Sequence, residues 1–166
     1  YRLAATTPVH IAVLGGSQGA SILASLVPDA ITMLDAPLRQ RLHIHQQARP
    51  EQIDDLQQRY IDLEVTADIQ SFYTDVPSLL GQSHLVICRA GASTLAELAA
   101  IGRPSLLLPL PSAMDDHQRM NALQMQDAGG GICLDETNLS AAVLATRLLQ
   151  LLDLWHWQQL RHRRFQ

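Results

Sequence analysis

The sequence contains no lysine, and all 12 of its basic residues are arginines. A phosphate-binding loop with a catalytic lysine, a Schiff-base enzyme and a lysine general base are therefore excluded. The net charge is −4 and the isoelectric point is about 5.9. A broad surface for nucleic acid needs the opposite charge balance, so no nucleic-acid partner is expected.

Cysteine is scarce as well. Cys88 and Cys133 lie in apolar runs and cannot build a disulfide framework, so we expect small buried residues of a reducing compartment. No stretch reaches the roughly 20 apolar residues that cross a bilayer. The chain opens with YRLAATTP, without an initial methionine or a signal peptide, and we expect it to be a piece of a longer protein.

Short apolar runs alternate with amphipathic stretches of helical length over the 166 residues, of which 47% are hydrophobic. This alternation predicts an α/β fold: a Rossmann-like, doubly wound, parallel six-stranded sheet with the strand order 3-2-1-4-5-6. We expect one domain over residues 1–152, followed by a separate, shortened C-terminal helix over 153–166. The expected strands are 10–14, 42–45, 63–66, 85–88, 105–108 and 132–134.

Three loops at the predicted carboxyl ends of these strands carry the polar residues of interest. The first is Gly15–Ala20 (GGSQGA), which opens a helix after the first strand. Glycines permit a tight turn there, and the free N–H groups of a helix N-terminus attract phosphate. The loop lacks the G-x-G-x-x-G fingerprint, and His45-Gln46-Gln47 provides no acidic residue for a ribose after the second strand, which disfavours an NAD-binding domain.

The second loop is Arg89–Glu97 (RAGASTLAE), which follows the fourth strand on the other side of the switch point of the sheet. Together with the first loop it can form an anion site. The same residues have a purely structural interpretation, because Thr94-x-x-Glu97 matches a capping box that requires no ligand.

The third loop is Pro109–Gln118, which leads into a helix. Asp115 or Asp116 can cap that helix. Gln118 and Asn121 are three residues apart, share a helix face and can bind the hydroxyls of a sugar through their amides. A solvated first turn explains the same residues. His117 could be a general base, although a lone histidine at a helix start is more often a capping or surface group.

Two other groups of residues are open to two interpretations. His43 and His45 alternate along one strand and could approach a metal, although alternation alone explains them. The C-terminal stretch contains aromatic residues beside arginines, which is typical of a membrane-surface helix or of a helix packed on its own domain. These residues are Trp155, Trp157, Arg161, Arg163 and Arg164.

The three loops in this order and spacing resemble the C-terminal, donor-binding domain of the MurG family, bacterial N-acetylglucosaminyltransferases of glycosyltransferase family 28. The resemblance runs from about Val9 to Asp135. It implies half of a two-domain GT-B enzyme that transfers N-acetylglucosamine from UDP-N-acetylglucosamine to lipid I, forming lipid II. It further implies a cytoplasmic location on the inner face of the bacterial cell membrane and no cofactor or metal.

The resemblance also implies a set of substrate-binding residues. Glu97 would bind the ribose hydroxyls, and Ser93 and Thr94, with the neighbouring Ala92, would hold the diphosphate. Ser17 and Gln18 would lie beside the diphosphate and the sugar. The remaining expected contacts are Gln118 and Asn121 with the N-acetylglucosamine and Phe72-Tyr73 with the uracil, which backbone groups would read.

The sequence departs from the family at two of these places. His117 stands where the family often has a first glutamine, and Tyr73 replaces a smaller aliphatic residue. The catalytic base and the acceptor site are expected in an N-terminal domain that this chain lacks. A non-catalytic UDP-sugar-binding module, or one that serves another acceptor, is the alternative.

Overall fold

The computed structural model describes the backbone of residues 7–111 and 116–163, with all side chains in these ranges except those of 17–20 and 154–163. Six strands form one parallel sheet in the order β3-β2-β1-β4-β5-β6, which confirms the predicted fold class and strand order. The strands are β1 (Val9–Leu14), β2 (Leu42–Gln47), β3 (Thr66–Gln70), β4 (Leu85–Cys88), β5 (Ser105–Leu107) and β6 (Gly131–Cys133).

Helices connect consecutive strands throughout the described chain. They are α1 (Gly16–Thr32), α2 (Ala36–Arg39), α3 (Ile53–Asp62), α4 (Val76–Gln82), α5 (Ala92–Ile101), α6 (His117–Asp127) and α7 (Ala141–Arg163), with 3-10 turns η1 (Pro50–Gln52) and η2 (Glu136–Asn138). Gly102 ends α5 in the left-handed conformation with φ 69°, which a glycine adopts without a steric penalty.

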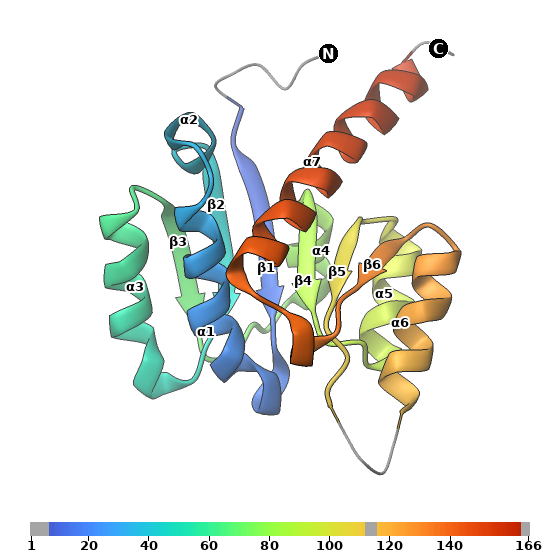
Figure 1. Cartoon of the computed structure of the whole chain (residues 1–166), viewed down its shortest axis with the longest axis horizontal. Helices are drawn as coiled ribbons and strands as arrows, with labels where there is room; N and C mark the ends of the chain where they lie inside the picture. Colours follow the sequence, from blue (N-terminus) through green and yellow to red (C-terminus); the bar gives the residue numbers. More distant parts are fainter. Residues whose placement is uncertain (1–6, 112–115, 164–166) are drawn as a thin grey trace.

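The helices cover the two faces of the sheet unequally. α1, α3 and α7 lie in front of the sheet in Figure 1 and form the larger apolar core with residues such as Ile11, Ile44 and Ile87. α4, α5 and α6 pack on the opposite face, where Val86, Leu98 and other apolar residues form a second cluster. Buried apolar residues on both faces explain why strand β4 reads as a continuous apolar run.

Two expected elements differ in the structure. The third strand begins at Thr66 and not at Leu63, because residues 63–65 close the end of α3: Glu64 has a φ of 58°, and the N–H of Val65 donates to the carbonyl of Tyr60. The apolar pair Leu63 and Val65 belongs to this turn, whereas β3 itself is half exposed and carries a weaker apolar signal. The sequence analysis was wrong here by a few residues.

The C-terminal segment is the second difference. One continuous helix, α7, runs through the position where the sequence predicted a break between two helices. The side chains of Trp155, Trp157, Arg161 and Arg163, and all of Arg164, lie outside the described parts, so the two interpretations of that segment stay open. Among the helices in the described ranges, including the 23-residue α7, none combines the length and the apolar character needed to cross a bilayer.

Candidate functional site

The two glycine-containing turns lie next to each other at the switch point of the sheet. β1 pairs with β4 and places Leu14 beside Cys88, and the N–H of Arg89 donates to the carbonyl of Leu14 at 3.4 Å. From these two neighbouring strands the chain enters α1 and α5. The carboxyl ends of all six strands point downward in Figure 1, where both helices begin.

Neither helix is capped by a side chain of its own N-cap residue. Gly15 is the N-cap of α1 and Gly91 that of α5, and neither first turn contains an acidic residue. The first N–H groups of a helix have no partner inside the helix, so two positively polarised helix ends follow two neighbouring strands. This arrangement suits a diphosphate.

The backbone conformation favours a glycine in the first of the two turns but not in the second. Gly16 has a φ of 64°, a conformation that other residues adopt only with strain, although a Cβ there would meet no atom within 4 Å. The space beside Gly91 is equally open, and its φ of −65° is ordinary. Ser17 and Gln18 follow in α1, but their side chains are outside the described set and their roles stay predictions.

The capping-box interpretation of Thr94 and Glu97 is wrong. Thr94 is the third residue of α5 and not its N-cap, which is Gly91. The carboxylate of Glu97 therefore has no capping role, and its Oε2 is buried without a hydrogen-bond partner in the described protein. A buried carboxylate oxygen without a donor is costly, so this atom is poised for a donor from a ligand.

Ala92 and Ser93 occupy the first turn of α5 and are exposed, while Thr94 is half-buried. They lie one turn before Glu97 on the same helix. The structure thus brings together the N–H groups expected to hold a diphosphate and the carboxylate expected to bind a ribose. No ligand contact tests these assignments, and they remain predictions.

Gln118 and Asn121 tie the start of α6 to the two neighbouring loops. The Oε1 of Gln118 accepts a hydrogen bond from the N–H of Leu110 at 2.9 Å. The Nδ2 of Asn121 donates to the carbonyl of Ala90 at 3.3 Å. Both amides thus face the carboxyl ends of β4 and β5, as the shared helix face predicted.

The expected cap of α6 is not formed by a side chain. Asp116 is the N-cap residue, but its carboxylate makes no capping hydrogen bond, and Asp115 lies outside the described residues. His117 is the first residue of α6 and is exposed. Among the described contacts, the amides of Gln118 and Asn121 tie the start of α6 to the neighbouring loops.

Phe72 and Tyr73 follow β3 and differ in their surroundings. Phe72 is 69% exposed. Tyr73 packs against the second apolar cluster and donates its hydroxyl to the carbonyl of Asp68 at 2.8 Å. Burial raises the pKa of the Tyr73 phenol, and the nearby Asp68 carboxylate adds to the shift. The Tyr73 side chain is thus held by the protein. The expected contact of this stretch with the uracil would therefore come from its backbone groups.

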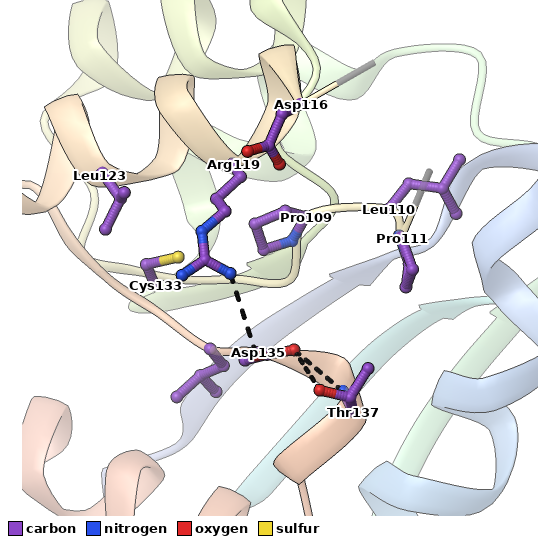
Figure 2. Close-up of a pocket in the computed structure, with 10 residues that line it drawn as sticks. Pro109, Leu110, Pro111, Asp116, Arg119, Leu123, Cys133, Asp135 and Thr137 are labelled. Atoms are coloured by element: carbon purple, nitrogen blue, oxygen red, sulfur yellow. Dashed lines mark hydrogen bonds and ion pairs between the residues drawn. The ribbon is translucent and has the colours of Figure 1, made fainter. Parts of the chain in front are cut away.

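A pocket of about 500 Å³ adjoins the start of α6 (Figure 2). Figure 2 shows Arg119 reaching toward Asp135, and the two side chains lie 3.9 Å apart. Asp135 in turn accepts hydrogen bonds from the N–H and hydroxyl of Thr137, which lower the pKa of its carboxyl. None of the predicted binding residues lines this pocket in the described structure. The described lining residues are Pro109, Leu110, Pro111, Asp116, Arg119, Leu123, Cys133, Leu134, Asp135 and Thr137.

Four of the seven histidines gather on the face of the sheet opposite α1. His10 lies 3.1 Å from His45 between ring nitrogens, and the His43 and His84 rings lie nearby. Within the described ranges, no three His, Cys, Asp or Glu side chains are placed to hold a metal ion. The alternation of His43 and His45 is thus explained by their strand.

The two cysteines are inert in this setting. Cys88 is buried in β4, and burial raises the pKa of its thiol to about 12. Cys133 is half-buried, and burial raises its thiol pKa too. Neither thiol is activated for nucleophilic attack.

The sequence analysis overlooked two residues that organise these loops. Arg89 forms an ion pair with Glu136, and Gln47 bridges two loops through its amide. The only signal for Gln47 was its place at the end of the second strand, where dinucleotide-binding domains have an acidic residue.

Residues 10–159 match the glycosyltransferase family 28 C-terminal domain. The chain belongs to this family. It is 45% identical over 146 residues to a relative from Paramagnetospirillum magneticum, and 46% identical over 142 residues to one from Zymomonas mobilis. Both relatives are named UDP-N-acetylglucosamine–N-acetylmuramyl-(pentapeptide) pyrophosphoryl-undecaprenol N-acetylglucosamine transferase.

These alignments cover 88% and 86% of this chain but only 39% and 37% of the relatives. The crystal structure of Acinetobacter baumannii MurG superposes with a TM-score of 0.78 at 32% identity, covering 91% of this chain and 45% of that one. The family 28 domain described here therefore spans less than half the length of its relatives, and the resemblance to the MurG family is confirmed.

Proposed function

We propose that this family 28 domain binds UDP-N-acetylglucosamine and is the donor half of an inverting N-acetylglucosaminyltransferase. The observation that carries the proposal is the position of Glu97. Its Oε2 is buried and has no hydrogen-bond donor among the described residues, one turn into a helix that its N-cap glycine does not cap. A nucleoside diphosphate supplies what this arrangement lacks: ribose hydroxyls for the carboxylate and phosphate oxygens for the N–H groups.

The relatives' names support the choice of donor and acceptor. On the basis of these names, we propose that the transferred sugar is N-acetylglucosamine and that the acceptor is lipid I, the undecaprenyl-pyrophosphoryl-linked N-acetylmuramyl pentapeptide. The product would be lipid II. Such an acceptor would hold the enzyme at the cytoplasmic face of the bacterial membrane. Gln118 and Asn121, whose amides stand beside the loops after β4 and β5, would contact the sugar.

The chemistry that this domain can supply is stabilisation of the leaving group. As the bond between the anomeric carbon and the UDP oxygen breaks, negative charge grows on the diphosphate. The N-termini of α1 and α5 stabilise that charge without lysine. The acceptor hydroxyl forms the new bond from the opposite face of the sugar, and its proton passes to a base that we assign to the part of the relatives beyond this domain.

Titration calorimetry on the domain tests this proposal. UDP and UDP-N-acetylglucosamine should bind, whereas NAD and ATP should not. A ligand at 100 times its dissociation constant should raise the free energy of unfolding by roughly 2.7 kcal/mol, which a thermal melt detects. Equal stabilisation by NAD would contradict the proposal and favour a dinucleotide-binding domain.

A further inference from the structure

Gln47, the last residue of β2, holds two separate loops with one side chain. Its Oε1 accepts a hydrogen bond from the N–H of Gly16 at 3.1 Å. Its Nε2 donates to the carbonyl of Ser71 at 3.2 Å. The amide thus spans from the start of α1 to the loop that follows β3.

These two loops are the opposite ends of the proposed donor site. Gly16 begins the helix whose first turn is expected to face the diphosphate. Ser71 directly precedes Phe72-Tyr73, the stretch expected to read the base. The loops also line one pocket of about 340 Å³, whose described lining residues are Gly16, Gln47, Ala48, Arg49, Pro50, Ser71 and Phe72.

We infer that Gln47 is a positioning residue of the donor site, an assignment that rests on the proposed function. By binding both loops it sets the distance between the phosphate end and the base end before a ligand arrives. The backbone alone does not do this: Ala48 N–H bonds the carbonyl of Gln70, but no described backbone hydrogen bond joins the Gly16 turn to the Ser71 loop.

Only an amide fulfils this role completely. Gln47 must accept from one N–H and donate to one carbonyl at the same time, and an amide carries both groups. A glutamate could accept from Gly16, but it could not donate to Ser71. It would also place negative charge beside the turn that is expected to face the diphosphate, which is unfavourable here, although a dinucleotide-binding domain has an acidic residue at the end of its second strand.

UDP and uridine should respond differently to the loss of the Gln47 hydrogen bonds. UDP contacts both ends of the site, so its affinity depends on their spacing. Uridine contacts only the base and ribose positions, so loss of the spacing should affect it little. A side chain that merely stabilises the fold would change the melting temperature without changing the ratio of the two affinities.

The test is titration calorimetry of UDP and uridine against the wild-type domain and Gln47→Met, which keeps the side-chain length but removes both hydrogen bonds. We expect the dissociation constant of UDP to rise about tenfold in Gln47→Met, while that of uridine changes by less than about twofold. Gln47→Glu should weaken UDP at least as much, because it adds charge and keeps only the acceptor.

Gln70→Met is the matched control. Gln70 is the register partner of Gln47 on β3, but its side chain bonds only Asp68 among the described residues. Its UDP affinity should equal that of the wild type. Amide hydrogen exchange gives a second readout, because the Gly16 N–H should exchange faster in Gln47→Met than in the wild type or in Gln70→Met.

Two results would overturn the inference. One is an unchanged UDP affinity in both Gln47 variants, and the other is an equal loss for UDP and uridine, which would confine Gln47 to the base end. A wild-type domain that binds neither ligand would instead contradict the proposed function itself, and the inference would fall with it.

Discussion

Arg89 and Glu136 form a partly buried ion pair, with 2.6 Å between Nη1 and Oε2 and side chains that are 12% and 19% exposed. Arg89 also donates to the carbonyl of Leu108 at 3.3 Å. One guanidinium thus joins the loop after β4 to the end of β5 and to η2. The loops at the carboxyl edge of the sheet are held together by charge as well as by backbone hydrogen bonds.

Breaking this pair should destabilise the domain strongly. Arg89→Met leaves the partly buried carboxylate of Glu136 without its partner, and we expect a loss of about 2–4 kcal/mol, between the values for exposed and for fully buried pairs. Urea denaturation measures the free energy of unfolding. Arg59→Met is the control, because the ion pair of Arg59 with Asp29 is more exposed and should contribute less than about 1 kcal/mol. Similar losses in both variants would contradict a special role for the Arg89 pair.

The fold could be predicted from the sequence because it depends on local patterns. Apolar runs such as Leu85–Cys88 and the rule of right-handed crossovers gave the parallel sheet and its strand order. The third strand was placed wrongly because the half-buried Leu63 and the buried Val65 belong to a turn, while β3 alternates half-buried and exposed residues. Apolar content alone does not separate a strand from the close of a helix.

The site could be predicted only in part. The loops that meet at the switch point follow from strand order, so Gly16, Glu97 and Gln118 were recognisable. Arg89 and Glu136 are 47 residues apart, and nothing in either local sequence marks them as partners. The same holds for Gln47, whose two partners lie on loops that meet only after the sheet has formed. Such contacts depend on side-chain geometry, which periodicity does not encode.

Glu97 should matter for nucleotide binding and not for stability. Glu97→Gln keeps the shape of the side chain but removes the charge that strengthens hydrogen bonds from a ribose. The affinity for UDP should fall by about 1–3 kcal/mol, measured by calorimetry. The free energy of unfolding should stay the same or rise, because Oε2 has no described protein donor to lose. A loss of stability with unchanged affinity would return Glu97 to a structural role.

Acid should destabilise the domain through its histidines. Burial lowers the pKa of His10 below its usual 6.5, and the neighbouring rings of His43, His45 and His84 add to the shift. Burial also lowers the pKa of His84, with a contribution from Arg103. The folded state therefore prefers neutral rings, whereas the unfolded chain takes up protons near pH 6.5.

The free energy of unfolding should therefore fall as the pH is lowered. The contribution of these rings to stability is complete above about pH 6.5 and is lost as the pH falls below it, because the unfolded state then binds more protons. Urea denaturation at about pH 7.5 and about pH 5.5 should show a lower free energy of unfolding in acid. Besides the histidines, the Asp68 carboxylate faces the cluster, 3.7 Å from His45. His10→Gln should reduce the pH dependence, and an unchanged dependence would assign it to other groups.

Gln118 should contribute to binding of the sugar and not of the nucleotide. Gln118→Ala should bind UDP within about twofold of the wild type but lose the additional affinity that UDP-N-acetylglucosamine gains from its sugar. The reason is geometric: Gln118 stands at the start of α6 and holds the Leu110 loop, whereas Glu97 and the first turn of α5 provide the expected nucleotide contacts.

Asn121→Ala should show the same loss together with a lower melting temperature, because the carbonyl of Ala90 loses its donor at the turn before α5. Gln124→Ala, an exposed position on the same helix, is the control and should change neither affinity. Calorimetric titration of both ligands against the three variants decides the assignment. If Gln118→Ala and Asn121→Ala weaken UDP as much as UDP-N-acetylglucosamine, then the start of α6 serves the phosphates, and the sugar must lie elsewhere along the carboxyl edge of the sheet.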